Sequence, residues 1–193
     1  QGKKTKASPY GSIDYPLNPP SLALGAQATF VARTIDRWQK HLAEMLDRSY
    51  NHDGGSFIEI YQNCNIFNDA AFEEYTGAEK FNNVIELKHG EPMVFAQGTK
   101  GIKLDGFKPK VVDMEKNSID DILVHDETDL DLAHMIANWT SHPILPEPIG
   151  VIYCIDKTTY NQDIVNQIEL AIKNKGAGNV QDLLNSGDTW VVD

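Results

Sequence analysis

The sequence predicts an α/β protein with a parallel sheet, and a strand, a helix and a second strand near the N-terminus carry this prediction. The apolar run at residues 28–32 and the apolar and aromatic run at residues 57–61 have the composition of strands. Residues 34–50 lie between them and carry apolar side chains at helical spacing. Two strands joined through a helix form a βαβ unit, so these strands are expected to be parallel.

From about residue 84 the pattern changes to short strand-like runs separated by turns. The runs lie at residues 84–87, 93–95, 102–104 and 110–112. Asp105-Gly106 between the last two is the clearest hairpin signal in the chain. This pattern predicts small antiparallel strands. We therefore expect a first domain over residues 1–83 and a small α+β C-terminal extension over residues 84–193.

The first domain is expected to begin with an extended arm. Residues 1–20 show no apolar period, and their prolines exclude a helix. Thr34 is the expected N-cap of the helix that ends near Tyr50. Its buried stripe would consist of Ile35, Trp38, Leu42, Met45 and Leu46. Asn68 or Asp69 would open a short helix that runs through Tyr75.

Three helices and a strand are expected in the second half of the chain. Thr128 is the expected cap of a helix with its buried stripe at Leu130, Ala133, Ile136 and Ala137. A strand over residues 149–155 would place Cys154 in the core. Thr159-x-x-Gln162 resembles a capping box for a helix that stops at Gly176, and residues 180–184 would form a last short helix.

Composition limits the classes of partner. The 193 residues carry a formal net charge of −11, from 17 Lys and Arg against 28 Asp and Glu. This acidity argues against nucleic-acid binding, which needs clustered basic residues. The one basic cluster, at Lys3, Lys4 and Lys6, is expected to be a solvated arm. With no signal peptide and no apolar run long enough to cross a membrane, we expect a cytoplasmic protein without a membrane partner.

Cys64 is the side chain whose position most suggests chemistry. It follows the predicted strand at residues 57–61, and reactive groups in α/β sheets gather beyond the carboxyl ends of strands. An inert, buried thiol is the alternative. A disulfide to Cys154 and a hydrolase that pairs Cys64 with His41 or His52 are weaker alternatives.

The acidic stretch at residues 120–131 lies close to His125 and His134. Carboxylates and imidazoles together can bind a metal ion, so a metal site is one interpretation. A solvated acidic surface that leads into a helix explains the same residues. The chain has no internal repeat, Walker loop or Gly-x-Gly-x-x-Gly motif.

Several motifs together resemble the β subunit of the 2-oxoacid:ferredoxin oxidoreductases, especially those of the 2-oxoglutarate type. They lie at residues 9–19, 25–33, 40–42, 55–69, 90–95, 100–102 and 187–191. Each motif alone is only moderately specific. Their order and spacing along nearly the whole chain together make the resemblance strong. The resemblance implies an incomplete sheet of the thiamine-diphosphate-binding type and a C-terminal extension.

The resemblance also implies a reaction and its cofactors. A 2-oxoacid would be decarboxylated on thiamine diphosphate held by Mg²⁺, the acyl group would pass to coenzyme A, and electrons would pass through a four-iron, four-sulfur cluster to ferredoxin. An α subunit would be the protein partner. Asn63 stands where many relatives have proline, so pyruvate or a branched 2-oxoacid remains an alternative substrate to 2-oxoglutarate.

Four residues receive roles from the resemblance. Cys64 would be the fourth thiolate ligand of the cluster. Lys40 would contact the substrate carboxylate, with an ion pair to Glu44 as the structural alternative. Asn18 and Arg33 would lie near the cleft for thiamine and substrate, and Asn18 could instead cap a turn.

Other motifs of the family are missing from this sequence. The Cys-x-x-Cys pair, the third cysteine and the Gly-Asp-Gly motif that bind the cluster and the Mg²⁺-diphosphate are absent, and the sequence starts at Gln1. We therefore expect the C-terminal part of such a subunit, which would be colourless and inactive in isolation. The alternative is a non-catalytic binding or assembly module that keeps only the subunit interface.

Overall fold

The computed structural model describes residues 2, 4, 6, 8–66, 68–140 and 142–192. Of the residues interpreted above, Gln1, Lys3 and the Phe67 position of the motif at residues 55–69 lie outside the described residues. The chain divides into two compact units, Gln1–Asp156 and Lys157–Asp193, and each is described by itself.

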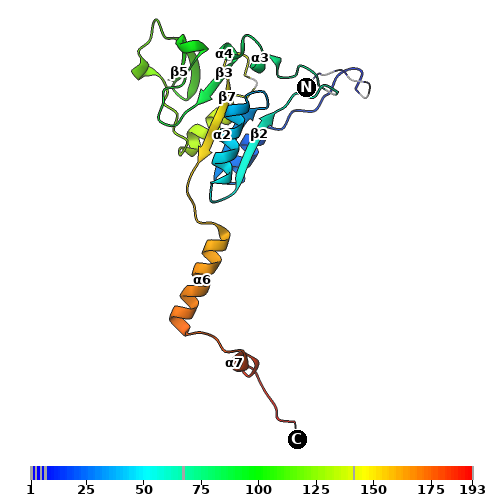
Figure 1. The fold of residues 1–193 in the computed structure, drawn as a ribbon, viewed down its shortest axis with the longest axis vertical. Helices are drawn as coiled ribbons and strands as arrows, with labels where there is room; N and C mark the ends of the chain where they lie inside the picture. Colours follow the sequence, from blue (N-terminus) through cyan, green and yellow to red (C-terminus); the bar gives the residue numbers. More distant parts are fainter. Residues whose placement is uncertain are drawn as a thin grey trace. The chain divides into compact units, whose positions relative to one another are not determined.

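A four-stranded sheet forms the centre of the first unit (Figure 1). Its order is β2-β1-β7-β3, with bounds β1 Phe30–Ile35, β2 Ser56–Tyr61, β3 Val84–Leu87 and β7 Glu147–Cys154. Strand β1 is parallel to β2, and β3 is parallel to β7, so the predicted βαβ unit and the α/β class are confirmed. The sheet is mixed rather than wholly parallel, because β7 lies antiparallel to β1 between the two parallel pairs.

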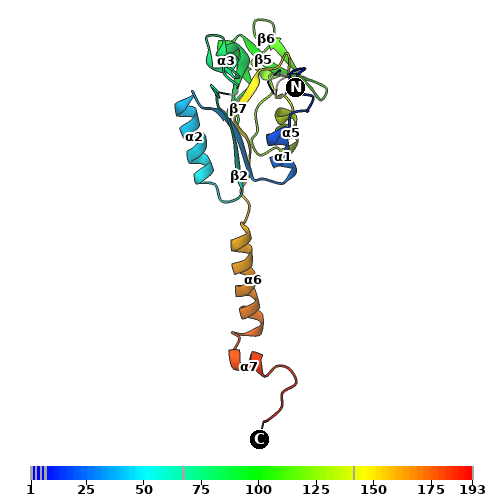
Figure 2. The ribbon, with the colours of Figure 1, turned by 90° about the vertical axis from the view of Figure 1, so that its right-hand side faces the viewer.

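Helices cover both faces of this sheet. Figure 2 shows α2, Gln39–Tyr50, on one face and α1, Pro19–Gly25, with α5, Leu130–Ala137, on the other. The largest core cluster lies under the second face. It includes Val31, Ile85, Ile102, Ala133, Ile136, Trp139 and Ile152. Burial of these apolar side chains supplies the main driving force for the fold.

Helix α2 begins later than the sequence indicated. Thr34 belongs to β1 and is fully buried, so it does not cap the helix; Trp38 occupies the N-cap position without a side-chain hydrogen bond. The buried positions of α2 are His41 and Met45, whereas Leu46 is 48% exposed. Of the expected stripe in this helix, Met45 is therefore buried and Leu42 half-buried, whereas Leu46 is exposed.

The expectation of an arm without helix is wrong for its last residues. Helix α1 begins at Pro19 and has prolines at its first two positions. The first N–H groups of a helix have no acceptor within the helix, so proline costs no hydrogen bond there. Asn18 is its N-cap, and the Asn18 side-chain oxygen accepts a hydrogen bond from the Ser21 N–H at 3.1 Å.

A second, three-stranded antiparallel sheet packs beside the first. Its order is β4-β5-β6, with bounds β4 Val94–Phe95, β5 Lys100–Asp105 and β6 Lys108–Asp113. The predicted hairpin at Asp105-Gly106 is confirmed: Asp105 pairs with Lys108, and Gly106 has a φ of 62°, which glycine adopts without strain. The short elements around this sheet are α3 Glu73–Thr76, α4 Lys80–Asn83, η1 Ala96–Gly98 and η2 Ile119–Asp121.

The expected domain boundary at residue 84 does not separate the strands of the main sheet. Strand β3 follows that boundary, yet it pairs with β7 and lies in the same sheet as β1. Gly150 of β7 makes this packing close: its φ is 111°, and a Cβ there would lie 2.7 Å from the Leu87 carbonyl oxygen. The assignment of the two halves to a cofactor domain and an extension remains a prediction.

Three local expectations need correction. Asp129, rather than Thr128, caps α5, and its carboxylate accepts from the Leu132 N–H. Leu132 is buried in this helix in place of Leu130, which is 43% exposed. Helix α3 begins at Glu73, several residues after Asn68 and Asp69, because Asn68 pairs with Cys64 in an isolated bridge.

The second unit contains two helices. Helix α6, Tyr160–Lys175, carries the predicted capping box of Thr159 and Gln162 and ends at Gly176, and α7 spans Val180–Leu184. Trp190, Val191 and Val192 are exposed and form no strand. Within the described residues, no helix has the length and apolar character needed to span a membrane.

We predict that Asn18→Ala lowers the free energy of unfolding by about 1–2 kcal/mol. The substitution removes the cap acceptor of α1 and also the donor that binds the Ala137 carbonyl. Urea denaturation followed by circular dichroism measures the change. Asn18→Asp keeps the cap acceptor and should lose only part of this stability; an Ala variant as stable as the parent would contradict the prediction.

Candidate functional site

The candidate site lies at one edge of the main sheet, where β1 and β2 end. Because β7 is antiparallel to β1 and β3 is parallel to β7, the first residues of β7 and β3 lie at this same edge. Groups beyond the carboxyl ends of strands are the usual site residues of α/β sheets. We call this region the carboxyl edge.

Arg33 lies inside the sheet rather than at its end. Its side chain has no solvent exposure, and its Nε donates to Glu59 at 2.7 Å while Nη1 donates to Glu147 at 2.5 Å. The remaining guanidinium contacts are from Nη1 to the Pro148 carbonyl at 3.3 Å and from Nη2 to Thr140 Oγ1 at 2.7 Å. Arg33 therefore joins β1, β2 and β7 through one buried charge, and its donors face protein acceptors rather than a cleft.

Asn18 is connected to Arg33 through the end of α5. The Asn18 amide donates to the Ala137 carbonyl at 2.8 Å, and Thr140 Oγ1 donates to the same carbonyl at 3.1 Å. Thr140 in turn accepts from Arg33. The structure thus brings the two predicted cofactor-binding residues into one hydrogen-bond chain, in which both have structural partners.

Two tyrosines complete the surroundings of Glu147. Tyr61 donates its hydroxyl proton to Glu147 Oε1 at 2.9 Å, and Tyr75 donates to Oε2 at 3.5 Å. Burial raises the pKa of both tyrosine hydroxyls well above the usual value, so they stay protonated as donors. The Tyr61 ring also stacks on Phe72, with centroids 4.5 Å apart.

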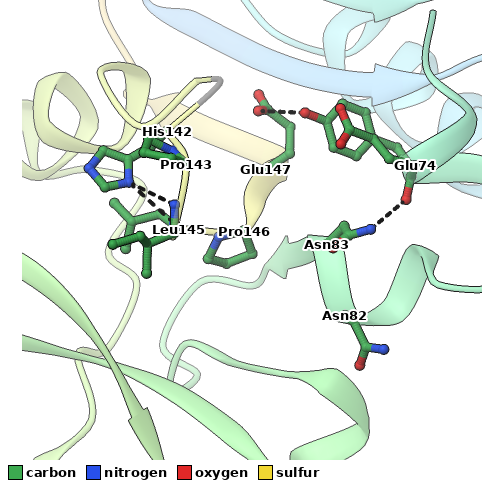
Figure 3. Close-up of a pocket in the computed structure, with 10 residues that line it drawn as sticks. Glu74, Asn82, Asn83, His142, Pro143, Leu145, Pro146 and Glu147 are labelled. Carbon is green, nitrogen blue, oxygen red and sulfur yellow. Dashed lines mark hydrogen bonds between the residues drawn. The ribbon is translucent and has the colours of Figure 1, made fainter.

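A polar pocket of about 290 Å³ opens beside Glu147 (Figure 3). It is lined by Glu74, Tyr75, Asn82, Asn83, His142, Pro143, Ile144, Leu145, Pro146 and Glu147. Asn83 donates to the Glu74 carbonyl at 3.0 Å, and His142 Nδ1 accepts from the Leu145 N–H at 3.3 Å. Because these contacts fix the lining side chains, the pocket suits a small polar ligand.

Cys64 lies at the carboxyl edge, as its position after β2 predicts, and is half-buried. The Asn68 N–H donates to the Cys64 carbonyl at 2.8 Å, and the Asn63 N–H donates to Asp36 at 3.3 Å. Asn63 also donates its amide to Asp69 at 3.0 Å. These contacts tie the cysteine loop to the turn that follows β1.

A four-cysteine cluster cannot be assembled from the described residues alone. Cys154 pairs with Phe30 at the start of β1, whereas Tyr61, just before the cysteine loop, pairs with Ile35 at its end. Five residue steps along a strand span about 17 Å, so the two thiols lie too far apart to share a cluster or a disulfide. Of the two cysteines, Cys64 therefore lies at the carboxyl edge and Cys154 at the opposite edge.

The described residues contain no group of three or more His, Cys, Asp or Glu side chains that could hold a metal ion. The proposed metal site near His125 is therefore not formed. His125 is 1% exposed, and its Nε2 donates to the Val151 carbonyl at 2.8 Å, so the ring is a core element.

A cysteine and a histidine meet at the opposite edge of the sheet. Cys154 Sγ lies 3.9 Å from His52 Nδ1, and His52 Nε2 lies 2.8 Å from Thr29 Oγ1. Burial raises the pKa of the Cys154 thiol, which lowers its nucleophilicity at neutral pH. His52 is thus remote from Cys64, and the hydrolase that would pair them is not supported.

Lys40 lies at the carboxyl edge, on the exposed first turn of α2. It borders an open hollow of about 480 Å³, which we call the His41 hollow. The lining residues are Arg37, Trp38, Gln39, Lys40, His41, Glu44, Lys80, Phe81 and Glu86. The alternative ion pair between Lys40 and Glu44 is not formed among the salt bridges of the described residues.

Sequence reasoning missed the buried polar groups of this edge. Glu147 lies in a proline-rich connection, where nothing in the local pattern indicates burial, yet it is 3% exposed. The hydroxyl contacts of Tyr61 and Tyr75 depend on Glu147, which lies 86 and 72 residues away along the chain.

Comparison with known proteins shows similarity along the whole chain. The chain is 38% identical over 198 residues to 2-oxoglutarate oxidoreductase subunit KorB of Mycobacterium tuberculosis, a match that covers 100% of this chain and 53% of that protein. Over 75 residues it is 36% identical to subunit beta of 2-oxoacid:ferredoxin oxidoreductase 1 of Aeropyrum pernix, covering 39% of this chain and 24% of that protein. These similarities confirm the resemblance carried by the motifs. No family model matches the sequence.

A solved structure shares the fold. The 2-oxoglutarate:ferredoxin oxidoreductase of Magnetococcus marinus, solved with 2-oxoglutarate, coenzyme A and succinyl-CoA bound, superimposes with a TM-score of 0.60 at 19% identity. The superposition covers 96% of this chain and 49% of that chain. The chain spans about half the length of the relatives that it matches over its full extent.

We predict that Arg33→Met destabilises the fold by about 3–5 kcal/mol, because it leaves the Glu59 and Glu147 carboxylates without their buried counter-charge. Arg37→Met is the matched control. Its ion pair with Glu73 is exposed and 3.7 Å long, so its loss should cost less than about 1 kcal/mol. Urea denaturation of both variants measures the difference, and equal losses would refute the role given to Arg33.

Stability should fall in mild acid because of His41. Burial lowers the pKa of His41 below its usual value of 6.5, so the unfolded chain takes up a proton that the folded chain does not. The contribution of His41 is complete above pH 6.5 and is lost as the pH falls from 6.5 toward the lower, folded pKa. His41→Gln should flatten the slope of unfolding free energy against pH in this range; an unchanged slope would contradict the expectation.

Proposed function

We propose that this chain forms part of the β subunit of a complex that oxidises 2-oxoglutarate. The chain is a homologue of the β subunits of 2-oxoacid:ferredoxin oxidoreductases. The observation that carries the proposal is the 38% identity to the KorB subunit over the full chain. In the reaction, the bond between the carboxylate and the keto carbon breaks and CO₂ leaves. The acyl carbon then bonds to the sulfur of coenzyme A, the thiol proton is released, and two electrons pass one at a time to ferredoxin.

Cofactors and partners follow from the same homology. Thiamine diphosphate, when bound, supplies the carbanion stabilisation that decarboxylation needs. The described residues contain no cluster of three or more His, Cys, Asp or Glu side chains, and they offer the iron-sulfur cluster one thiolate, Cys64. The remaining ligands must therefore come from other sequence, and the partner is proposed to be an α subunit.

The residues of this chain have distinct roles in the proposal. Cys64 supplies its thiolate from a loop that is hydrogen-bonded to the end of β1. Lys40 presents its ammonium group at the same edge, where it would bind the carboxylate of the substrate. Arg33 and Asn18 are positioning residues: the chain of hydrogen bonds through Ala137 and Thr140 holds β1, α1 and α5 behind the edge.

The proposal is tested by purifying the tagged chain from the cells that naturally produce it. We expect an α subunit to copurify, and we expect the complex to reduce ferredoxin when both 2-oxoglutarate and coenzyme A are present. Pyruvate and branched 2-oxoacids, assayed in parallel, identify the substrate. An assembly without oxidoreductase activity toward any 2-oxoacid would refute the proposal in favour of an assembly module.

Cys64→Ser should abolish the visible absorbance of the cluster and lower activity by at least about 100-fold, because a serine oxygen replaces a thiolate ligand. Cys154→Ser is the matched control, since Cys154 lies at the opposite edge of the sheet, and it should keep both signals. Retention of the cluster in the Cys64 variant would remove Cys64 from the ligand set while leaving membership of the complex intact.

A further inference from the structure

The cysteine loop is tied to the end of β1 at its root. This loop comprises the residues between Tyr61, the last residue of β2, and Glu73, the first residue of α3. The Asp36 N–H donates to the Tyr61 carbonyl at 3.0 Å, and the Asn63 N–H donates to Asp36 Oδ2 at 3.3 Å. Asp36 is thus both donor and acceptor, and the two contacts continue the pairing of β1 with β2 past the ends of the strands.

The side chain of Asn63 closes the loop at its far end. Its Nδ2 donates to Asp69 Oδ1 at 3.0 Å, and the Ala70 N–H donates to the same oxygen at 3.0 Å. These two hydrogen bonds lower the pKa of Asp69, so its carboxylate stays ionised as an acceptor at neutral pH. Ala70 has a φ of 58°, a left-handed conformation that is unfavourable for alanine, and the shared acceptor helps to hold it there.

The side-chain amide of Asn63 has one favourable orientation. Its Nδ2 faces the Asp69 carboxylate, and its Oδ1 is buried without a hydrogen-bond partner among the described residues. A flipped amide would set two acceptors against each other, because an ionised carboxylate cannot donate. The amide therefore acts as a donor, and its contact with Asp69 is kept although a buried acceptor without a partner is unfavourable.

Cys64 lies inside the segment that these contacts close. It follows Asn63 directly, and its carbonyl accepts from the Asn68 N–H at 2.8 Å in an isolated bridge. Its side chain belongs to a half-buried residue. The position of the thiol is therefore set by backbone that Asn63 attaches to β1 on one side and to Asp69 on the other.

We propose that Asn63 is a positioning residue for Cys64: its N–H ties the cysteine loop to β1 through Asp36, and its amide closes the loop through Asp69. The inference rests on the proposed function, in which Cys64 supplies a thiolate ligand. A metal–sulfur bond tolerates an error of only about 0.2 Å in its length, so a ligand on a fixed loop loses less conformational freedom on binding. Proline, which many relatives have at this position, has no N–H and no amide and can make neither contact.

The first test measures how fast Cys64 is alkylated by iodoacetamide in the 193-residue chain, with Cys154 as internal reference. Peptide mass spectrometry follows the two thiols separately at fixed pH. Asn63→Pro should react about tenfold faster at Cys64, because both contacts that close the loop over the half-buried thiol are lost. Asn63→Ala keeps the N–H that binds Asp36 and should react about threefold faster. Asn117→Ala, which removes a comparable exposed amide contact of 2.8 Å outside the loop, is the matched control and should change nothing.

Two results of this experiment would overturn the proposal. One is a Cys64 rate in Asn63→Pro at or below that of the parent chain. The other is an equal acceleration at Cys64 and Cys154, because this would show general unfolding instead of a local opening of the loop.

A swap of two side chains tests the hydrogen bond itself. Asn63→Asp alone sets two carboxylates against each other and should raise the Cys64 rate about tenfold. The double variant Asn63→Asp with Asp69→Asn restores one amide facing one carboxylate at the parent's net charge, and the new amide oxygen can still accept from the Ala70 N–H. We expect its Cys64 rate to return to within about twofold of the parent. A double variant as reactive as Asn63→Asp alone would overturn the proposal.

The role in metal binding has a readout of its own, which is the loss of iron to a chelator. In the complex isolated for the proposed function, Asn63→Pro should keep the α subunit and lose iron about fivefold faster than the parent. The Asn63→Asp, Asp69→Asn double variant should lose iron at the parent's rate. Equal rates in Asn63→Pro and the parent would overturn the proposal.

These outcomes separate the inference from the proposed function. An active complex in which Asn63→Pro changes neither the alkylation of Cys64 nor the loss of iron would refute this inference alone. Conversely, a chain that shows the expected alkylation rates but forms no oxidoreductase complex would refute the proposed function and leave Asn63 as the residue that holds Cys64 in place.

Discussion

The buried charge of Arg33 is the constraint on which the arrangement of the carboxyl edge depends. A guanidinium with no solvent exposure is tolerated only if its donors are paired, and Glu59 and Glu147 supply the opposite charges from β2 and β7. These two carboxylates come from strands on either side of β1. The ion pairs therefore fix the order of the three strands as well as the charge.

The same contacts also shape the walls of the polar pocket beside Glu147 and of the His41 hollow. Glu147 is held by Arg33 and by the tyrosine hydroxyls, and Tyr75 in turn accepts the Trp38 indole N–H at its carbonyl, 3.1 Å away. Trp38 thus connects the wall of the Glu147 pocket to the wall of the His41 hollow.

Sequence reasoning succeeded where the structure is governed by local pattern. The Asp105-Gly106 hairpin, the capping box at Thr159 and the strand before Cys64 each depend on residues that are neighbours in the chain. The resemblance to a known family also came from short, contiguous motifs. These features place Cys64 and Lys40 at one edge of the sheet without any knowledge of tertiary contacts.

Sequence reasoning failed where contacts between residues far apart in the chain determine the local structure. Thr34 has the chemistry of an N-cap, but its place in β1 and its bond to His41 keep it in the strand. Asn18 has a capping side chain, and only contact with Ala137, 119 residues away, shows that it also joins two helices. Strand β7 was expected, but its position between β1 and β3 depends on long-range pairing that no single-sequence pattern specifies.

The groups that the proposed reaction needs are only partly present at the carboxyl edge. Cys64 presents one thiolate, whereas a four-iron cluster needs four protein ligands. The carboxyl edge nevertheless already positions Cys64 and Lys40 on segments that follow β1 and β2, and the Asn63 contact to Asp36 joins those segments. The groups that complete the cofactor sites would therefore have to bind at this preorganised edge. The ion pairs of Arg33 fix the strands that carry the edge, so its geometry would be set before those groups bind.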